Sequence, residues 1–213
     1  GSHGARLRER IMQWNERITG SRFIRGVNTI GGVAKDIGNE EGKELIKDID
    51  VLQKDFEEVI AVADNSSSLI NRLQGTGVLD PEIALDHGAL GVVARANGIL
   101  RDARVDYPYA AYGRLAVSIA EGKEGDVCAR FRVRVKEVRS SFAIIKTALK
   151  HLKDTNGVLC AQEAVSFKKD YYAIGITEGW RGDIVYFVAT DSEGAISRVD
   201  VRDPSFLNWT TIA

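Results

Sequence analysis

The chain has 213 residues, 44% hydrophobic and 28% charged, which fits one buried-core domain or one domain with a small appendage. A formal net charge of −1 gives no reason to expect binding to nucleic acid or another polyanion. No run of about 18 uncharged apolar residues occurs, which excludes a membrane-spanning helix within this sequence.

Both ends of the sequence are atypical of a natural chain. Gly1-Ser2-His3 is typical of an expression scar, and we set it aside from the fold. The last residues, 207–213, enter an apolar run, where natural C-termini are seldom found. We therefore expect an internal fragment of a larger subunit.

Helical periodicity dominates the first part of the chain. Apolar residues at spacings of three and four, bounded by capping or breaking residues, predict helices over 5–19, over 41–63, from near Leu69, and from Asp80-Pro81 to Gly88. Between the first two, Gly26 and Gly31-Gly32 indicate a backbone with unusual dihedrals or a close approach to another segment.

In the middle of the chain, the sequence predicts an irregular segment followed by a long helix. Residues 89–124 are rich in Gly, Ala, Arg and Tyr and show no steady period, which predicts an irregular segment. Asp126 then caps the strongest predicted helix, whose apolar residues recur at steps of four and three as far as Leu152. Asn156-Gly157 is expected to end it.

After Gly157 the apolar period changes from 3.6 to 2, which indicates strands. The pattern predicts strands over 171–177, 184–188 and 196–199, with a turn at 191–194. The predicted fold class is therefore α+β, a mainly helical bundle with a small antiparallel sheet. We assign residues 4–157 to the helical body and residues 158–213 to the β segment.

The long predicted helix carries a run of basic residues: Arg130, Arg132, Arg134, Lys136 and Arg139. Its interleaved apolar residues form the core stripe, so the run is most simply the solvated face of an amphipathic helix. A contact with phosphate or with an acidic protein partner is the alternative.

Cysteine and histidine give no metal-binding pattern. Cys128 and Cys160 lack a C-x-x-C arrangement and a nearby histidine, and two ligands are too few for a zinc or iron–sulfur site. We predict free, buried thiols. His87 and His151 have no second ligand at helical spacing.

The segment Glu178–Asp183 joins two predicted strands, a position where functional groups tend to lie. Gly179 and Gly182 flank Trp180-Arg181, so the backbone can turn sharply and project the guanidinium into solvent. From these residues alone a plain β-turn remains the alternative.

At this point the sequence resembles a known family. Residues 178–182, Glu-Gly-Trp-Arg-Gly, resemble the E-x-P-R-G or E-x-x-R/K-G loop of nickel–iron hydrogenase large subunits and the matching loop of the large quinone-site subunit of respiratory complex I. Residues 202–209 resemble the R-x-P-S-F-x-N-W segment of the energy-converting and formate-hydrogenlyase branch.

Three earlier segments resemble the same family, in the family's order. Residues 16–33 are similar to E-R-x-x-G-x-R…G-G-V, residues 91–112 to G-x-x-x-R-A-S/N-G…D…R-P-Y-x-x-Y, and residues 125–141 to G-D…R…R-V-x-E-x-x-Q/R-S. The matches extend from about residue 13 to residue 209, and together they are specific.

The resemblance implies that the intact parent is the catalytic subunit of a membrane-associated nickel–iron hydrogenase, an oxidoreductase that splits or forms dihydrogen. It implies electron transfer to an iron–sulfur small subunit. It also implies a cytoplasmic location, peripheral on the inner face of the membrane, through the membrane subunits of a respiratory-type complex. Arg181 and Glu178 would be the catalytic residues, with Arg181 a fixed cation over the nickel–iron centre.

The chain departs from the family in its metal ligands, because the two C-x-x-C pairs would lie upstream and downstream of it. We therefore expect no metal- or cofactor-binding residue here, no activity of the fragment alone, and self-association through exposed apolar surface. Ala34, where complex I members often carry histidine, favours the hydrogenase branch. The alternatives are a complex I-type NADH:quinone oxidoreductase, which is quinone- and NAD-linked, and a metal-free homologue used for subunit assembly.

Overall fold

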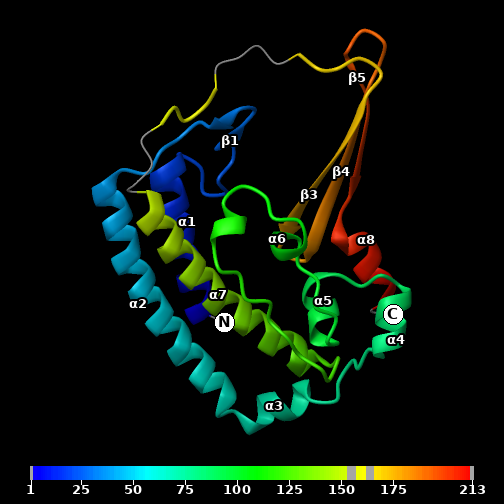
Figure 1. Ribbon diagram of the computed structural model, residues 1–213. Helices are drawn as coiled ribbons and strands as arrows, with labels where there is room; N and C mark the ends of the chain where they lie inside the picture. The colour runs from blue at the N-terminus through cyan, green and yellow to red at the C-terminus, as the bar shows by residue number, and fades with distance from the viewer. Residues whose placement is uncertain (1, 153–156, 162–165, 212–213) are drawn as a thin grey trace. The chain divides into compact units, whose positions relative to one another are not determined.

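The computed structural model describes residues 2–152, 157–161 and 166–211, and it confirms an α+β fold that is mainly helical with one small antiparallel sheet (Figure 1). The chain forms two compact units, residues 1–65 with 145–165 and residues 66–144 with 166–213. Whether the predicted helical body and β segment are separate domains stays a prediction.

The first unit is built on two long helices that pack together, α1 (Ser2–Thr19) and α2 (Asn39–Asp64). The predicted periodicity is confirmed, because the buried residues of α2 are Leu45, Ile49, Leu52 and Ile60. The last turns of α7 (Val127–Leu152) also belong to this unit, where Lys146 Nζ lies 3.0 Å from Asp50 Oδ1. At the end of α1, Gly20 has φ +75°, which stops the helix as expected.

A two-stranded ribbon that the sequence did not predict follows α1. Its strands, β1 (Asn28–Thr29) and β2 (Gly32–Val33), pair in antiparallel fashion around Gly31, which has φ +91°. A Cβ at Gly32 would lie 2.9 Å from the Cα of Cys160. The prediction that these glycines need unusual dihedrals or a close approach is thus confirmed.

The second unit contains most of α7 and a series of short helices. These are α3 (Ser67–Leu73), α4 (Pro81–Asp86), α5 (Gly91–Ala96), α6 (Ala103–Asp106) and the 3₁₀ helix η1 (Tyr112–Arg114). Ser66 and Asp80 cap α3 and α4 as predicted, each accepting a backbone hydrogen bond. The prediction that 89–124 is irregular was wrong in part, since helices of one or two turns are too short to show a period.

Asp126 begins α7 as predicted. Its Oδ1 accepts a 2.7 Å hydrogen bond from the Ala129 N–H, and its Oδ2 accepts a 2.8 Å bond from the Gly75 N–H. Burial would raise the pKa of Asp126, but these hydrogen bonds hold it below its ordinary value. The predicted end of the helix at Asn156-Gly157 lies partly outside the described residues.

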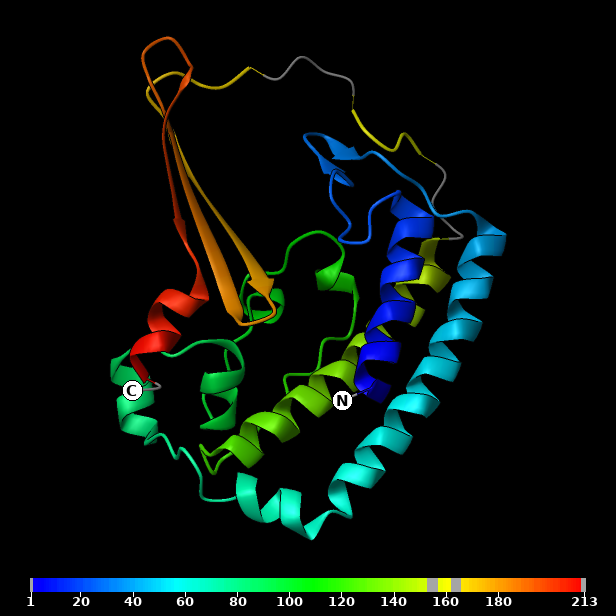
Figure 2. The same cartoon turned by 180° about the vertical axis from the view of Figure 1, so that it is seen from behind.

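The sheet has the strand order β3-β4-β5 and is antiparallel throughout. Its strands are β3 (Tyr172–Gly179), β4 (Gly182–Thr190) and β5 (Ile196–Arg202), at the positions predicted but longer. Glu178 pairs with Asp183, so the predicted six-residue loop is wrong and only Trp180 and Arg181 form the turn. Figures 1 and 2 show this turn next to α5 and α6.

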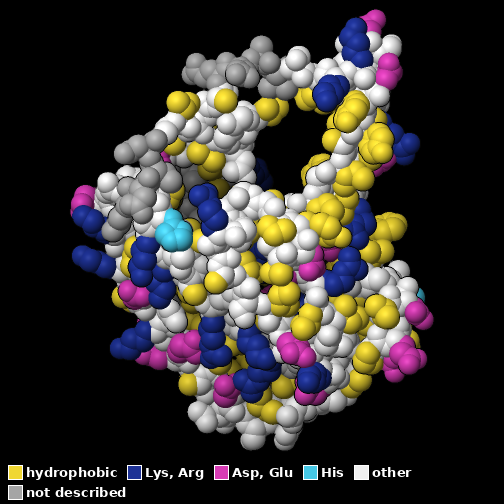
Figure 3. Space-filling view, in the orientation of Figure 1, with side chains coloured by type: hydrophobic (Ala, Val, Ile, Leu, Met, Phe, Trp, Pro, Cys, Tyr) yellow, Lys and Arg dark blue, Asp and Glu magenta, His cyan; other side chains and the backbone are white. Residues whose placement is uncertain are grey.

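Many apolar side chains of the sheet are exposed, and Figure 3 shows hydrophobic side chains along it. They include Tyr172, Ile174, Tyr186, Val199 and Val201. Exposed apolar surface of this kind is typical of an interaction site. Self-association of the fragment stays a prediction.

A short helix that the sequence did not predict, α8 (Pro204–Asn208), follows the sheet and leads into the 3₁₀ helix η2 (Trp209–Thr211). Asp203 caps it, because its Oδ1 accepts a 2.8 Å hydrogen bond from the Ser205 N–H. None of the helices described is long and apolar enough to cross a bilayer.

Candidate functional site

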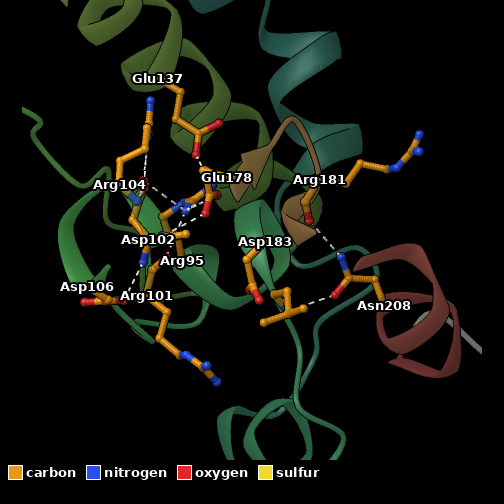
Figure 4. A network of polar contacts seen from close by, with 12 residues as sticks. Arg95, Arg101, Asp102, Arg104, Asp106, Glu137, Glu178, Arg181, Asp183 and Asn208 are labelled. Atoms are coloured by element: carbon orange, nitrogen blue, oxygen red, sulfur yellow. Dashed lines mark hydrogen bonds and ion pairs between the residues drawn. The ribbon is translucent and has the colours of Figure 1, made fainter. Parts of the chain in front are cut away.

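Glu178, one of the two predicted catalytic residues, lies near the end of β3 with its side chain only 6% exposed. Its Oε1 is 3.1 Å from Arg95 Nη1, and its Oε2 accepts a 3.0 Å hydrogen bond from the Ala103 N–H. The Glu178 N–H donates to the hydroxyl of Tyr109 at 3.1 Å. The carboxylate of Glu178 is therefore held within the network shown in Figure 4, and its backbone N–H is held by Tyr109.

Arg95, in the last turn of α5, is the centre of this arrangement and is 3% exposed. Its Nη1 donates to the Arg101 carbonyl at 2.9 Å and lies 3.4 Å from Asp102 Oδ2. Its Nη2 lies 2.7 Å from Glu137 Oε1, on α7. One buried guanidinium thus faces three carboxylates from α7, β3 and the start of α6. We call Arg95, Asp102, Arg104, Glu137 and Glu178 the Arg95 cluster.

Asp102 caps α6 and is paired twice by Arg104. Arg104 Nε and Nη2 donate to Asp102 Oδ1 and Oδ2 at 2.9 and 2.6 Å, and the Arg104 N–H adds a third bond. Burial would raise the pKa of Asp102, but the Arg104 hydrogen bonds and the nearby Arg95 hold it below its ordinary value. Asp102 raises the pKa of Arg104 in turn, so this pair is fully charged at neutral pH.

The pKa of Glu178 is shifted in the opposite direction to that of Asp102. Burial raises its pKa, and the negative charge of Asp102 adds to that effect. The hydrogen bond from Ala103 and the charge of Arg95 oppose the rise without cancelling it. Glu178 therefore takes up a proton at a higher pH than an exposed glutamate does.

A pocket of about 370 Å³ opens onto this cluster, and we call it the Glu178 pocket. Besides four members of the Arg95 cluster, it is lined by Tyr112, Arg134, Val138, Ser141, Gly179 and Trp180. The Arg134 guanidinium stacks on the Trp180 ring, 4.2 Å from its centroid. Burial lowers the pKa of Arg134, and the charges of Arg181 and Arg95 lower it further against the attraction of Glu137.

The basic run is therefore not a single solvated face, and that prediction was wrong in part. Arg134 lines the pocket, and Arg130 donates to the carbonyls of Gly125 and Gly77 at 2.7 and 2.9 Å. Lys136 is exposed, as a solvated face requires. Amphipathic periodicity places these side chains on a helix but does not show which of them meet other segments.

Arg181, the second predicted catalytic residue, points away from the Arg95 cluster in Figure 4. Its side chain is 52% exposed, as the glycine-flanked turn predicts, and its Nη2 lies 3.8 Å from Asp203 Oδ2. It lines a second pocket of about 370 Å³, here the Arg181 pocket. The other lining residues are Val92, Val93, Arg134, Ser205, Asn208 and Trp209.

The backbone of the turn is fixed by α8 and by two glycines. Asn208 Nδ2 donates to the Arg181 carbonyl at 3.1 Å, and Asn208 Oδ1 accepts from the Leu90 N–H at 2.8 Å. A Cβ at Gly91 would overlap the Arg181 carbonyl, and a Cβ at Gly182 would lie 2.7 Å from that of Leu90. The glycines thus permit a close contact between the turn and the start of α5, while the Arg181 side chain stays exposed.

Replacing Asn208 with alanine is expected to lower the free energy of unfolding by about 1–3 kcal/mol, because the buried Leu90 N–H loses its acceptor. Chemical denaturation measures this difference. Asn65→Ala is the matched control, since the Asn65 amide donates to a carbonyl on an exposed helix end and its loss costs under about 1 kcal/mol. Equal effects of the two variants would contradict the role given to Asn208.

The structure separates the two residues that the sequence placed in one site. Glu178 belongs to the buried cluster, and Arg181, three residues later, faces a different pocket. Residue patterns alone did not identify Arg95, Asp102, Glu137 and Arg134 as site residues. The available signal was their position in segments that match family motifs.

The thiol prediction is confirmed for Cys128 and corrected for Cys160. Both are free, but Cys160 is partly exposed, with its Sγ 3.3 Å from Thr29 Oγ1. Among residues 2–152, 157–161 and 166–211, no group of three or more His, Cys, Asp or Glu side chains has the arrangement of a metal site.

Comparison with known proteins gives a family match over most of the chain. Residues 2–173 match the family model described as respiratory-chain NADH dehydrogenase, 49 Kd subunit. The chain is 35% identical to NADH-quinone oxidoreductase subunit 4 of Thermus thermophilus, over 97% of this chain and 56% of that protein. It is 30% identical to formate hydrogenlyase subunit 5 of Escherichia coli, over 97% of this chain and 36% of that protein.

A solved structure shares the fold of the whole chain. It is a chain of the membrane-bound sulfane sulfur reductase, an archaeal respiratory membrane complex, with a TM-score of 0.88 and 28% identity. The match covers 100% of this chain and 60% of that one. The present chain thus spans between about one third and three fifths of the length of these relatives.

Proposed function

Since the chain belongs to the respiratory-chain NADH dehydrogenase 49 Kd subunit family, we propose that it forms the central part of the catalytic large subunit of a membrane-associated nickel–iron hydrogenase. Relatives from this family are subunits of oxidoreductases and of respiratory membrane complexes. In this proposal an iron–sulfur subunit receives the electrons, and membrane subunits hold the protein at the membrane surface.

The observation that carries this proposal is the meeting of two distant segments at Arg181. The Glu-Gly-Trp-Arg-Gly segment supplies the side chain, and the Ser-Phe-Leu-Asn-Trp segment supplies Asn208, which bonds to the Arg181 carbonyl. Both line the Arg181 pocket, and the side chain of Arg181 is 52% exposed. A guanidinium is a permanent cation in proteins, so we assign Arg181 the role of a fixed cation that stabilises negative charge developing in the pocket.

The described residues do not fit a nickel centre held by four thiolates. The chain has two cysteines, and no metal-binding group occurs among the described side chains. In this proposal the thiolates belong to the parent protein outside the present sequence. This chain contributes Arg181, its supporting backbone contacts and the walls of the pocket.

A quinone-reducing complex is the second candidate. It is favoured by the 35% identity to the NADH-quinone oxidoreductase subunit, against 30% for the formate hydrogenlyase subunit. The two candidates differ in the substrate of the assembled parent. Dihydrogen oxidation with an artificial acceptor supports the first, whereas quinone reduction without dihydrogen activity supports the second.

In the parent complex, replacing Arg181 with glutamine is expected to lower the turnover number about a hundredfold, because a pre-positioned charge in the pocket is lost. Initial rates of dihydrogen oxidation measure this loss. Arg198→Gln, at an exposed position of β5, is the control and should leave the rate unchanged. An Arg181 variant as active as the control, in a complex that still assembles, would contradict the role of Arg181.

A further inference from the structure

The Arg95 cluster contains more negative than positive groups. Three carboxylates, Asp102, Glu137 and Glu178, share the two guanidinium groups of Arg95 and Arg104. Arg104 pairs with Asp102, which leaves Arg95 to neutralise both glutamates. A buried excess charge is costly unless a further cation or a proton removes it.

Arg134 is the nearest candidate for that further cation, but it does not pair with the cluster. Its guanidinium stacks on Trp180, and among the described residues it makes no ion pair with the cluster carboxylates. Burial disfavours the charged form of Arg134, as do the like charges of Arg181 and Arg95, while the charge of Glu137 favours it. Because Arg134 forms no ion pair with the cluster, a proton on Glu178 is the simplest way to neutralise the cluster.

Two buried atoms indicate where that proton would be exchanged. Arg95 Nε and Glu137 Oε1 are buried without a hydrogen-bond partner. Glu137 Oε1 does lie 2.7 Å from Arg95 Nη2, and we take this as an ion pair whose angle is poor for a hydrogen bond. Both residues line the Glu178 pocket, whose 370 Å³ far exceeds the roughly 30 Å³ that one water occupies.

We propose that Glu178 carries an exchangeable proton, and that the Glu178 pocket passes this proton between the Arg95 cluster and solvent. In this exchange the O–H bond of the Glu178 carboxyl group breaks and an O–H bond to a pocket water forms. This gives a carboxylate and a hydronium ion that passes the proton to solvent, and the reverse transfer restores the carboxyl group. Use of this route in turnover rests on the proposed function, since redox chemistry on dihydrogen or a quinone releases or consumes protons.

Several titratable groups face the two glutamates from the surrounding elements. They are Arg95 from α5, Asp102, Arg104 and Asp106 from the start and end of α6, Tyr109 and Tyr112 from the segment around η1, and Arg134 from α7. Asp106 accepts from the Asp102 N–H and adds negative charge. Burial raises the pKa of Tyr112, which therefore stays neutral when a glutamate titrates.

Carbon NMR of the chain with labelled glutamate carboxyl groups tests the proton on Glu178 directly. We expect one glutamate to titrate above the ordinary value of about 4.3, with its resonance absent in Glu178→Gln. In Glu137→Gln the pKa of Glu178 should fall by about one pH unit, because a neighbouring negative charge is removed. Glu193→Gln, at an exposed turn, is the control and should leave the pKa of Glu178 unchanged.

Ordinary titration of every glutamate in the unmodified chain would overturn the proposal without the need for any variant. So would a Glu137→Gln variant in which the elevated titration is unchanged. Neither of these two measurements uses the Glu178→Gln variant, so both remain valid if that variant fails to fold.

Turnover of the parent complex tests whether protons pass through the Glu178 pocket during the reaction. Glu137→Gln should slow turnover about tenfold and shift its pH profile, while reduction of the iron–sulfur clusters by an external donor keeps its rate. An unchanged pH profile overturns the proton route and leaves the proposed function intact. A raised pKa of Glu178 in a parent without dihydrogen or quinone activity overturns the proposed function and leaves the exchangeable proton on Glu178 intact.

Discussion

Replacing Arg95 with leucine is expected to lower the free energy of unfolding by about 3–5 kcal/mol, because it leaves buried carboxylates without their cation. Arg95 is 3% exposed and lies within 3.4 Å of Asp102, Glu137 and Glu178. The loss of one partner in a buried ion network is far more harmful than the loss of a surface pair. Urea denaturation of both proteins at pH 7 measures the difference.

The matched control is Arg198→Leu, since Arg198 and Asp200 form an ion pair whose side chains are largely exposed. That variant should stay within about 1 kcal/mol of the unmodified chain. The Arg95 defect should also shrink in acid, because protonation of Glu178, whose folded pKa is raised, removes a charge that Arg95 otherwise neutralises. An Arg95 variant no less stable than the control would mean that the cluster adds nothing to stability.

The sign of the Glu178 contribution follows from its raised pKa. The folded chain binds this proton more tightly than the unfolded chain, so the stability from this group is complete below the unfolded value of about 4.3. It is lost as the pH rises through the folded pKa. Asp102 behaves in the opposite way, because its folded pKa is lowered and its contribution is lost as the pH falls.

Replacing Gly91 with alanine is expected to cost about 2–5 kcal/mol, the sum of an unfavourable backbone conformation and a steric overlap. Gly91 has φ +58°, and a Cβ there would overlap the Arg181 carbonyl. Either α5 or the turn must move, and the hydrogen bond from Asn208 to that carbonyl is then weakened. Thermal and urea denaturation measure the cost.

Gly75→Ala separates the backbone contribution to the loss of stability from the contribution of steric overlap. Gly75 has a similar φ of +64°, but nothing lies within 4 Å of the position that a Cβ would take there. Its replacement should therefore cost only the backbone part, about 1–2 kcal/mol. If Gly91→Ala costs no more than Gly75→Ala, the contact between α5 and the turn is not tight.

Local signals in the sequence were sufficient to locate the long elements but not all of their boundaries. The apolar stripe of α2 extends over many residues, so packing on one face leaves a readable period. Asp80-Pro81 correctly predicted α4, and Asp203-Pro204 carries the same signal for α8. The second helix was missed because it is only five residues long, including Pro204, before the 3₁₀ turn begins.

The Arg95 cluster could not be predicted from local patterns. Its members come from α5, the start of α6, α7 and β3, and 83 positions separate Arg95 from Glu178. Their contact depends on how short helices without a period fold back on one another. Family resemblance placed Arg95, Asp102 and Glu137 in matching segments but gave no indication that they meet around one guanidinium.

The way in which the backbone of the Trp180-Arg181 turn is held has a consequence for which residue types can occupy positions 180 and 181. The backbone of the turn is fixed through the Arg181 carbonyl, Gly91 and Gly182. The largely exposed side chains of Trp180 and Arg181 add a stack with Arg134 and an ion pair with Asp203. Their chemistry can therefore be exchanged, a lysine for the arginine or another residue for the tryptophan, without rebuilding the scaffold. One backbone can thus present different side chains to the Glu178 pocket from position 180 and to the Arg181 pocket from position 181.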